Sequence, residues 1–147
     1  MRRRVGAIVA AALPLAALLG VGAQTAHADP WICQSQPNPT ITVSDGAANE
    51  SAGSVKVKVT LNSCSSAKVK WATIDGTAKA GSDYTGGSGI MTLTPPHNDV
   101  LNLVFLLKKD LNCEGTENFH VWLSNATGAT ITDGWGVVTI NDCHPVP

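Results

Sequence analysis

From residue 40 onward the chain alternates apolar and polar side chains with a period of two. Between residues 54 and 61 three valines and a leucine alternate with lysine and threonine, and Val69 and Trp71 alternate with Lys68 and Lys70. This spacing places the apolar side chains on one face of an extended strand, whereas no segment of this part keeps the 3.6-residue period of an amphipathic helix. The sequence therefore predicts an all-β fold.

Turn sequences such as Asp75-Gly76 and Pro95-Pro96 divide the alternating segments into seven expected strands. The expected strands are Thr40–Val43, Ser54–Leu61, Lys68–Ile74, Gly89–Thr94, Val100–Lys108, Asn118–Ser124 and Trp135–Asn141. The segment 100–108 is apolar on both faces, which is typical of a central strand. Seven short strands at this spacing predict a seven-stranded, immunoglobulin-like antiparallel sandwich.

The N-terminus has the features of a secretory signal peptide. Three arginines at positions 2–4 precede an apolar run over residues 5–23, and Ala26-His27-Ala28 is a small-residue cleavage pattern. An uncleaved membrane anchor is the alternative that this length permits, but Pro14 and the cleavage pattern favour removal of residues 1–28. We therefore expect residues 29–147 to form one secreted, extracellular domain with no membrane span.

The exported part has no pattern typical of a catalytic site. GxSxG, HExxH and phosphate-loop sequences are absent, and a single small sandwich offers no deep cleft for an enzyme. Removal of the three arginines changes the formal net charge of the whole chain from −1 to −4, which disfavours nucleic acid as a partner. We expect a binding or structural module whose partner, a protein or a glycan, is unknown.

All four cysteines lie in the exported part, where an even count predicts two disulfides. The midpoint of Cys33 and Cys64 falls in the loop between the first two expected strands, and that of Cys113 and Cys143 falls between the last two. The other connectivities would join opposite ends of a sandwich roughly 20 Å long, at about 3.3 Å per strand residue. The expected pairs are therefore Cys33–Cys64 and Cys113–Cys143.

Because successive strands are expected to alternate in direction, each loop is assigned to one of two ends of the sandwich. Eight of the eleven acidic residues fall at one end, with three lysines to offset them. The eight are Asp45, Glu50, Asp75, Asp83, Asp110, Glu114, Glu117 and Asp142. Clustered carboxylates repel one another and favour a calcium ion with six to eight oxygen ligands, although charged loops are also common simply because loops are solvated.

Three segments of the sequence resemble the Calx-beta domain family. Residues 71–84, WATIDGTAKAGSDY, resemble its DGTA-x-AGSDY signature. Residues 113–125, CEGTENFHVWLSN, are similar to its E-x-x-E-x-F-x-V-x-L-S-N segment, and VTIND at 138–142 is similar to its closing VTI-x-D. The resemblance covers roughly residues 41–142, and it implies a seven-stranded sandwich that binds calcium at one end.

The resemblance also implies a set of calcium ligands. They are Glu50, Asp83, Asp110, Glu114, Glu117 and Asp142, with the carbonyl of Asn112 as a further candidate. The chain departs from the family pattern at Lys109, Asn141 and Cys143, where calcium-binding members carry aspartates. Two hypotheses follow: a calcium-binding module with a reduced ligand set, or a metal-independent structural or adhesion module in which Lys109 and the Cys113–Cys143 bridge replace the ion.

Overall fold

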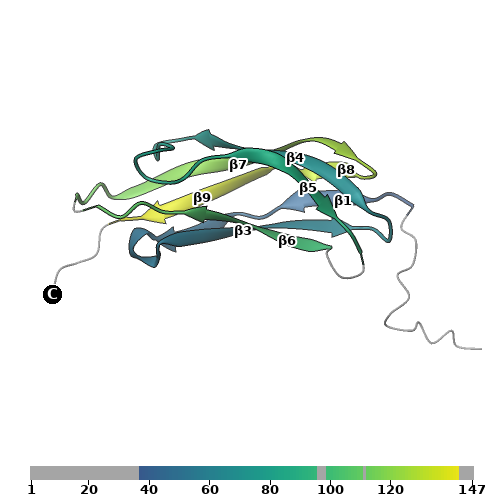
Figure 1. Ribbon diagram of the computed structural model, residues 1–147, viewed down its shortest axis with the longest axis horizontal. Coiled ribbons are helices and arrows are strands. Elements are labelled where there is room, and N and C mark those ends of the chain that lie inside the picture. Colours follow the sequence, from purple (N-terminus) through teal and green to yellow (C-terminus); the bar gives the residue numbers. More distant parts are fainter. Residues whose placement is uncertain (1–36, 96–98, 111, 143–147) are drawn as a thin grey trace, which may run out of the picture.

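The computed structural model describes residues 37–95, 99–110 and 112–142. In these residues the strands form two sheets packed face to face (Figure 1). The four-stranded sheet has the order β6 (Val100–Leu106), β3 (Ser54–Asn62), β1 (Thr40–Val43), β8 (Thr130–Asp133). The five-stranded sheet has the order β2 (Gly46–Asn49), β9 (Trp135–Asn141), β7 (Thr116–Thr127), β4 (Ala67–Asp75), β5 (Ser88–Leu93). One 3-10 turn, η1 (Glu50–Ala52), precedes β3.

The core lies between the sheets and is built by the alternation predicted from the sequence. Val55, Val57 and Val59 of β3 face inward, while the lysines between them are exposed. Phe119 of β7 is fully buried and contacts Phe105 of β6 edge-on, with ring centroids 5.4 Å apart. Each such side chain contributes about 1.5–3 kcal/mol by leaving water. The predicted all-β sandwich is therefore confirmed.

The described residues contain nine strands, so the expected count of seven is wrong. The two additional strands are β2 and β8, and each forms a parallel pair, β2 with β9 and β8 with β1. The sequence of β2 is Gly-Ala-Ala-Asn, which lacks the branched and aromatic residues that mark strands. The chain changes sheets between β1 and β2, where Ser44 still donates to Lys58 O while Asp45 already accepts from Val137 N.

The expected central strand at 100–108 is an edge strand, β6. Its outward side chains are exposed, with Val104 52% and Leu106 58% accessible to solvent. Beside it, Lys56 of β3 pairs with Val104 in the antiparallel ladder. Apolar residues on both faces therefore did not indicate burial of both faces here.

Several sequence expectations lie outside the described residues. They include the signal peptide at 1–28, Cys33 and Cys143. Cys64 and Cys113 are both disulfide-bonded, but the two predicted pairings stay predictions because their other members are outside the described part. In residues 37–95, 99–110 and 112–142, no helix has the length and apolarity needed to cross a bilayer.

One end of the sandwich collects the segments that carry most of the acidic residues. Figure 1 shows η1, the β4–β5 loop, the β6–β7 loop and the end of β9 together at the left. Asp45 is an exception to the predicted grouping, because its carboxylate accepts a hydrogen bond of 2.7 Å from Val137 N in the middle of β9. The strand directions thus position a candidate site at one pole.

Candidate functional site

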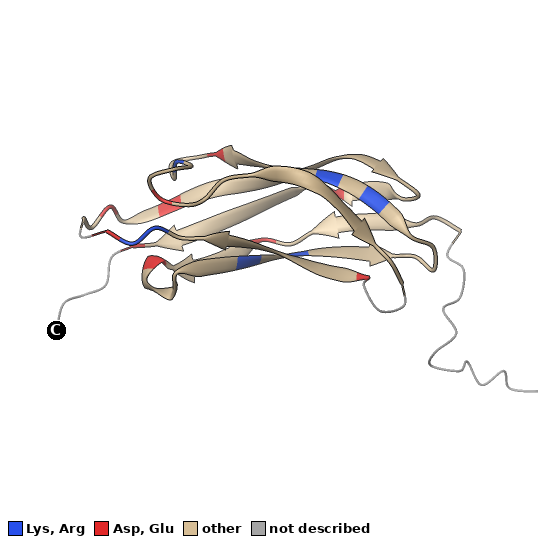
Figure 2. Cartoon of the chain, viewed as in Figure 1, with Lys and Arg blue, Asp and Glu red and all other residues tan. Residues whose placement is uncertain are grey.

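Five separate segments bring the six predicted ligands to this acidic pole, which is visible as the cluster of red segments at the left of Figure 2. Glu50 begins η1, Asp83 lies in the β4–β5 loop, and Glu117 is the second residue of β7. Asp110 and Glu114 lie in the β6–β7 loop, and Asp142 follows β9 directly. The described part of the chain thus contains the whole predicted set.

Three of the six carboxylates form a compact group. One oxygen each from Asp83, Glu114 and Glu117 lies within 4.8 Å of the others. Glu114 is exposed, and the other two are partly buried. Three oxygens at this spacing can converge on one hard cation, with water or carbonyl oxygens completing the coordination.

The other three acids form a hydrogen-bonded group around Glu50, whose side chain is nearly buried. Glu50 Oε1 accepts from Asp110 N at 3.0 Å, and the Glu50 and Asp142 carboxyl groups share a hydrogen bond. Burial is the largest cause that raises the pKa of Glu50, followed by this bond to Asp142. The pKa of Asp142 is lowered, first by the Glu114 backbone N–H at 2.6 Å. The pKa values of these two hydrogen-bonded carboxyl groups are therefore shifted in opposite directions.

The compact group also has shifted pKa values. Desolvation is the largest cause of the raised pKa of Glu114, and the charges of Asp110, Asp83 and Asp142 add to it. Desolvation also comes first for Glu117, followed by the charges of Asp83, Glu114 and Asp142. Every charged neighbour that raises these two pKa values is a carboxylate, so the site favours either protonation or a bound cation.

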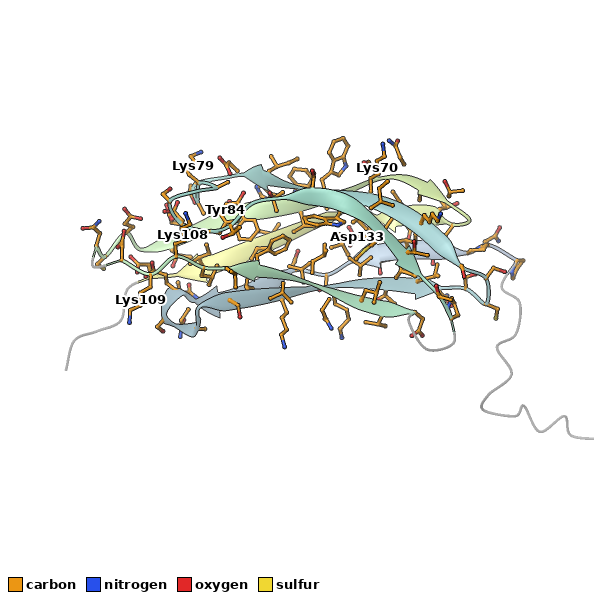
Figure 3. All side chains as sticks on the ribbon, in the orientation of Figure 1. Lys70, Lys79, Tyr84, Lys108, Lys109 and Asp133 are labelled. Atoms are coloured by element: carbon orange, nitrogen blue, oxygen red, sulfur yellow. The ribbon has the colours of Figure 1, made fainter. Side chains whose placement is uncertain are left out.

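Lysine side chains do not neutralise this cluster within the described residues. Lys79 Nζ donates to Gly76 O at 2.6 Å, and Lys108 Nζ donates to Gly81 O. The Lys109 side chain extends away from the sandwich, below the ribbon in Figure 3. The proposed replacement of an ion by the Lys109 ammonium therefore has no supporting contact among residues 37–95, 99–110 and 112–142.

A network around Asp75 fixes the loop that carries Asp83, and sequence analysis did not assign this role. Asp75 Oδ1 accepts from Ala80 N at 2.9 Å and from the Tyr84 hydroxyl at 2.8 Å. Asp83 Oδ2 accepts from Lys79 N at 2.6 Å, which turns the loop back on itself. Both aspartates belong to the DGTA-x-AGSDY segment, but their roles differ. Asp75 holds the loop in place through hydrogen bonds, and Asp83 contributes an oxygen to the acidic cluster.

Gly76 shows why this loop begins with glycine. A Cβ at position 76 would lie 2.2 Å from Asn118 Oδ1 and 2.5 Å from Asn118 O. The loop therefore passes directly against β7, where Asn118 N donates to Thr77 Oγ1 at 2.8 Å. This close contact places Asp83 beside Glu117, one residue before Asn118.

Comparisons with known proteins identify the family and agree with the fold. The Calx-beta domain family model matches residues 35–143. The apo-form Calx CBD1 domain is 24% identical, with a TM-score of 0.65, and the match covers 73% of this chain and 99% of that one. CBD12 from CALX1.2 is 25% identical with a TM-score of 0.63, covering 70% of this chain and 45% of that one.

A third solved structure is the calcium binding domain CBD12 of CALX1.1. It is 26% identical with a TM-score of 0.62, and the match covers 69% of this chain and 45% of that one. The chain thus spans less than half of either CBD12 structure. A search of curated proteins gave no match.

Proposed function

Because this chain belongs to the Calx-beta domain family, we propose that it is a binding module that takes up calcium at its acidic pole through a reduced ligand set. The observation that carries the proposal is the convergence of Asp83, Glu114 and Glu117 oxygens within 4.8 Å. The calcium-binding CBD12 of CALX1.1, which shares this fold, is the related example.

The chemistry of the cluster suits calcium better than zinc. Its side-chain ligands are all carboxylates, without histidine or thiolate, and calcium prefers six to eight oxygens at about 2.3–2.6 Å. The carboxylates come from loops as well as from β7, which fits an ion that tolerates irregular geometry. Glu50, Asp110 and Asp142 would support the compact group and supply further oxygens.

The alternative is a metal-independent structural or adhesion module. It is favoured by the hydrogen bond between the Glu50 and Asp142 carboxyl groups and by the Asp110 and Glu114 N–H groups, which already satisfy part of the cluster. Cys113, which is disulfide-bonded, lies in the same loop as Glu114. In either case we propose a secreted protein without catalytic activity, which rests on the sequence of residues 1–28 and on the family.

Thermal unfolding with chelator, calcium or magnesium distinguishes the two functions. A calcium-specific rise in Tm that grows with concentration is expected, since a ligand at about 100 times its Kd adds about 2.7 kcal/mol to the free energy of unfolding. Extracellular calcium modules have Kd values of about 0.1–1 mM, so millimolar calcium is required. An unchanged Tm across this range would favour the metal-independent module.

A pair of variants locates the site. Glu117→Gln removes one charge of the compact group and should abolish most of the calcium-dependent rise. Asp99→Asn removes an exposed acidic residue just before β6, and this variant should retain the calcium-dependent rise in Tm. Equal calcium effects in both variants would contradict the assignment of the ion to this cluster.

A further inference from the structure

The outer face of the five-stranded sheet contains a groove that the acidic pole does not use. Two open cavities, of about 660 and 330 Å³, lie along β4 and β5. They share Ala72 and Ser88 as lining residues, so they adjoin, and the larger one extends along the β4–β5 loop to Lys108. Ala72 and Ser88 face each other in the β4–β5 ladder, and their small side chains leave this part of the sheet surface low.

Two exposed tryptophan side chains lie on the same face of the sheet, beside the cavities on the side of β7. Trp122 pairs with Ala72 across the β4–β7 ladder and with Trp135 across the β7–β9 ladder. Both indoles are about half exposed, at 49% and 46%. His120 stacks on Trp135 with ring centroids 4.7 Å apart and thereby supports that indole. The row from Ser88 to Trp135 crosses four strands, or roughly 14 Å at about 4.8 Å per strand.

The charge of this face is opposite to that of the whole chain. Lys70 lines the smaller cavity and Lys108 the larger one, and neither cavity has an acidic residue in its lining. The outward positions of β4, β5, β7 and β9 include Lys68 and Lys70 but no Asp or Glu. Figure 3 shows Lys70 projecting outward from the sheet. Such a face attracts an anionic partner even though the formal net charge is −1.

The geometry points to an acidic glycan, a chain of uronic acid residues, as the occupant of this groove. A sugar ring has an apolar C–H face, which packs on an exposed indole, and a rim of hydroxyl groups, which needs polar partners. Trp122 and Trp135 provide the aromatic surface, and Ser88, Ser124 and Thr85 line the groove with hydroxyl groups. Lys68 and Lys70 occupy exposed outward positions of β4 and would pair with carboxylates along the polymer.

Binding of polygalacturonate by the purified protein tests this inference. The measurement is isothermal titration calorimetry with a chelator present, so that calcium cannot bridge the polymer to the acidic pole. Trp122→Ala and Lys70→Ser should each lower the affinity by about tenfold or more. Ser88→Asp places a negative charge in the groove at an exposed edge-strand position and should have the same effect without disturbing the core.

Matched controls are available on the outer face of the other sheet. Lys58→Ser and Leu106→Ala change an exposed lysine and an exposed apolar residue there, and both should keep the affinity within about twofold. Dextran, a neutral glucan, should bind at least about tenfold more weakly than polygalacturonate. Weaker binding of all three groove variants, with both controls unchanged, would support the inference.

Four outcomes would overturn it. The first is a failure of polygalacturonate to bind. The second is equal binding of dextran, which would show that the lysines have no role. Poly-glutamate binds as tightly through Trp122 and Lys70, which would identify an acidic peptide as the occupant. Sedimentation shows a dimer that Trp122→Ala dissociates, which would assign this face to a second copy of the chain. Each of these results is independent of calcium binding at the acidic pole.

Discussion

At the scale of single residues, the hydrogen bond between Tyr84 and Asp75 connects the core to the loop that carries Asp83. The Tyr84 side chain is fully buried and its ring stacks on Phe119, with centroids 3.8 Å apart, while its hydroxyl reaches Asp75 Oδ1. Burial raises the pKa of Tyr84 to about 12, and the bond to Asp75 adds to this shift. The neutral hydroxyl therefore remains a donor throughout the physiological range.

Tyr84→Phe removes this donor but keeps the stacked ring. We expect a loss of about 0.5–1.5 kcal/mol in the free energy of unfolding, the usual net contribution of one hydrogen bond. Two hydrogen bonds lower the pKa of Asp75 from 3.8: the one from the Ala80 N–H has the larger effect, and the one from the Tyr84 hydroxyl adds to it. The resulting stabilisation is present above about pH 3.8 and is lost as the pH falls through the folded-state pKa.

Urea unfolding at about pH 7 and at about pH 3 measures both effects. The loss caused by Tyr84→Phe should become smaller as the pH falls through the lowered folded-state pKa of Asp75, because a protonated Asp75 no longer has a charge for the hydroxyl to stabilise. A loss that is the same or larger in acid would show that the hydroxyl does not act through Asp75.

The six carboxylates could be predicted as a group, whereas the hydrogen bonds among them could not. Strand direction and the family pattern assign Glu50 and Asp142 to the same pole, but the raised pKa of Glu50 depends on its side chain being nearly buried. Asp45 was misplaced for a related reason. Its position in a kink between two sheets, where it accepts from Val137 N, depends on a change of sheet that alternation does not reveal.

At the scale of elements, periodicity predicted the faces of the strands better than their neighbours. The boundaries of β9 agree with the prediction, and those of β3 and β4 differ by one residue. Alternation reports which side of a strand meets the core, but not whether another strand is bonded to its edge. β6 was therefore expected at the centre of a sheet, and β2, with small residues only, was not expected at all.

Neighbouring positions on β6 provide a test of its edge location. Leu103 faces the core and is 8% exposed, so Leu103→Ala should cost about 2–5 kcal/mol. Val104 faces solvent, and Val104→Ala should cost about 0.5 kcal/mol or less. Chemical denaturation of both variants measures the difference. Similar large losses at the two positions would instead indicate that a further strand or partner covers the outer face of β6.

At the scale of the whole molecule, carboxyl groups with raised and with lowered pKa values lie together at the acidic pole, so the stability of this pole depends on pH and on cations. The pKa values of Glu50, Glu114 and Glu117 are raised above 4.5 in the folded state. Their stabilising contribution is present below about pH 4.5 and is lost as the pH rises through their folded-state pKa values. The sequence predicted the location of this charge, but its protonation depends on burial and on distances that only the folded chain defines.

Because the pKa values of these three glutamates are raised, we expect the effect of calcium on Tm to grow with pH. In chelator, ionisation of the three glutamates destabilises the pole as the pH rises above about 4.5, and a bound cation would remove that repulsion. The difference in Tm between calcium and chelator should therefore be near zero at about pH 4 and largest near pH 7. Differential scanning calorimetry across this range, with magnesium as the control ion, measures it.

Glu117→Gln supplies the matching control for this dependence. With one fewer carboxylate in the compact group, the protein in chelator should lose less stability between about pH 4 and pH 7. The gain at neutral pH should not exceed about 1 kcal/mol, because the side chain is partly exposed and its charge is screened. The calcium effect should also become flat with pH. A calcium effect that is independent of pH in the unmodified protein, or larger in acid, would place the ion away from these carboxylates, because protons and calcium compete for the same oxygens.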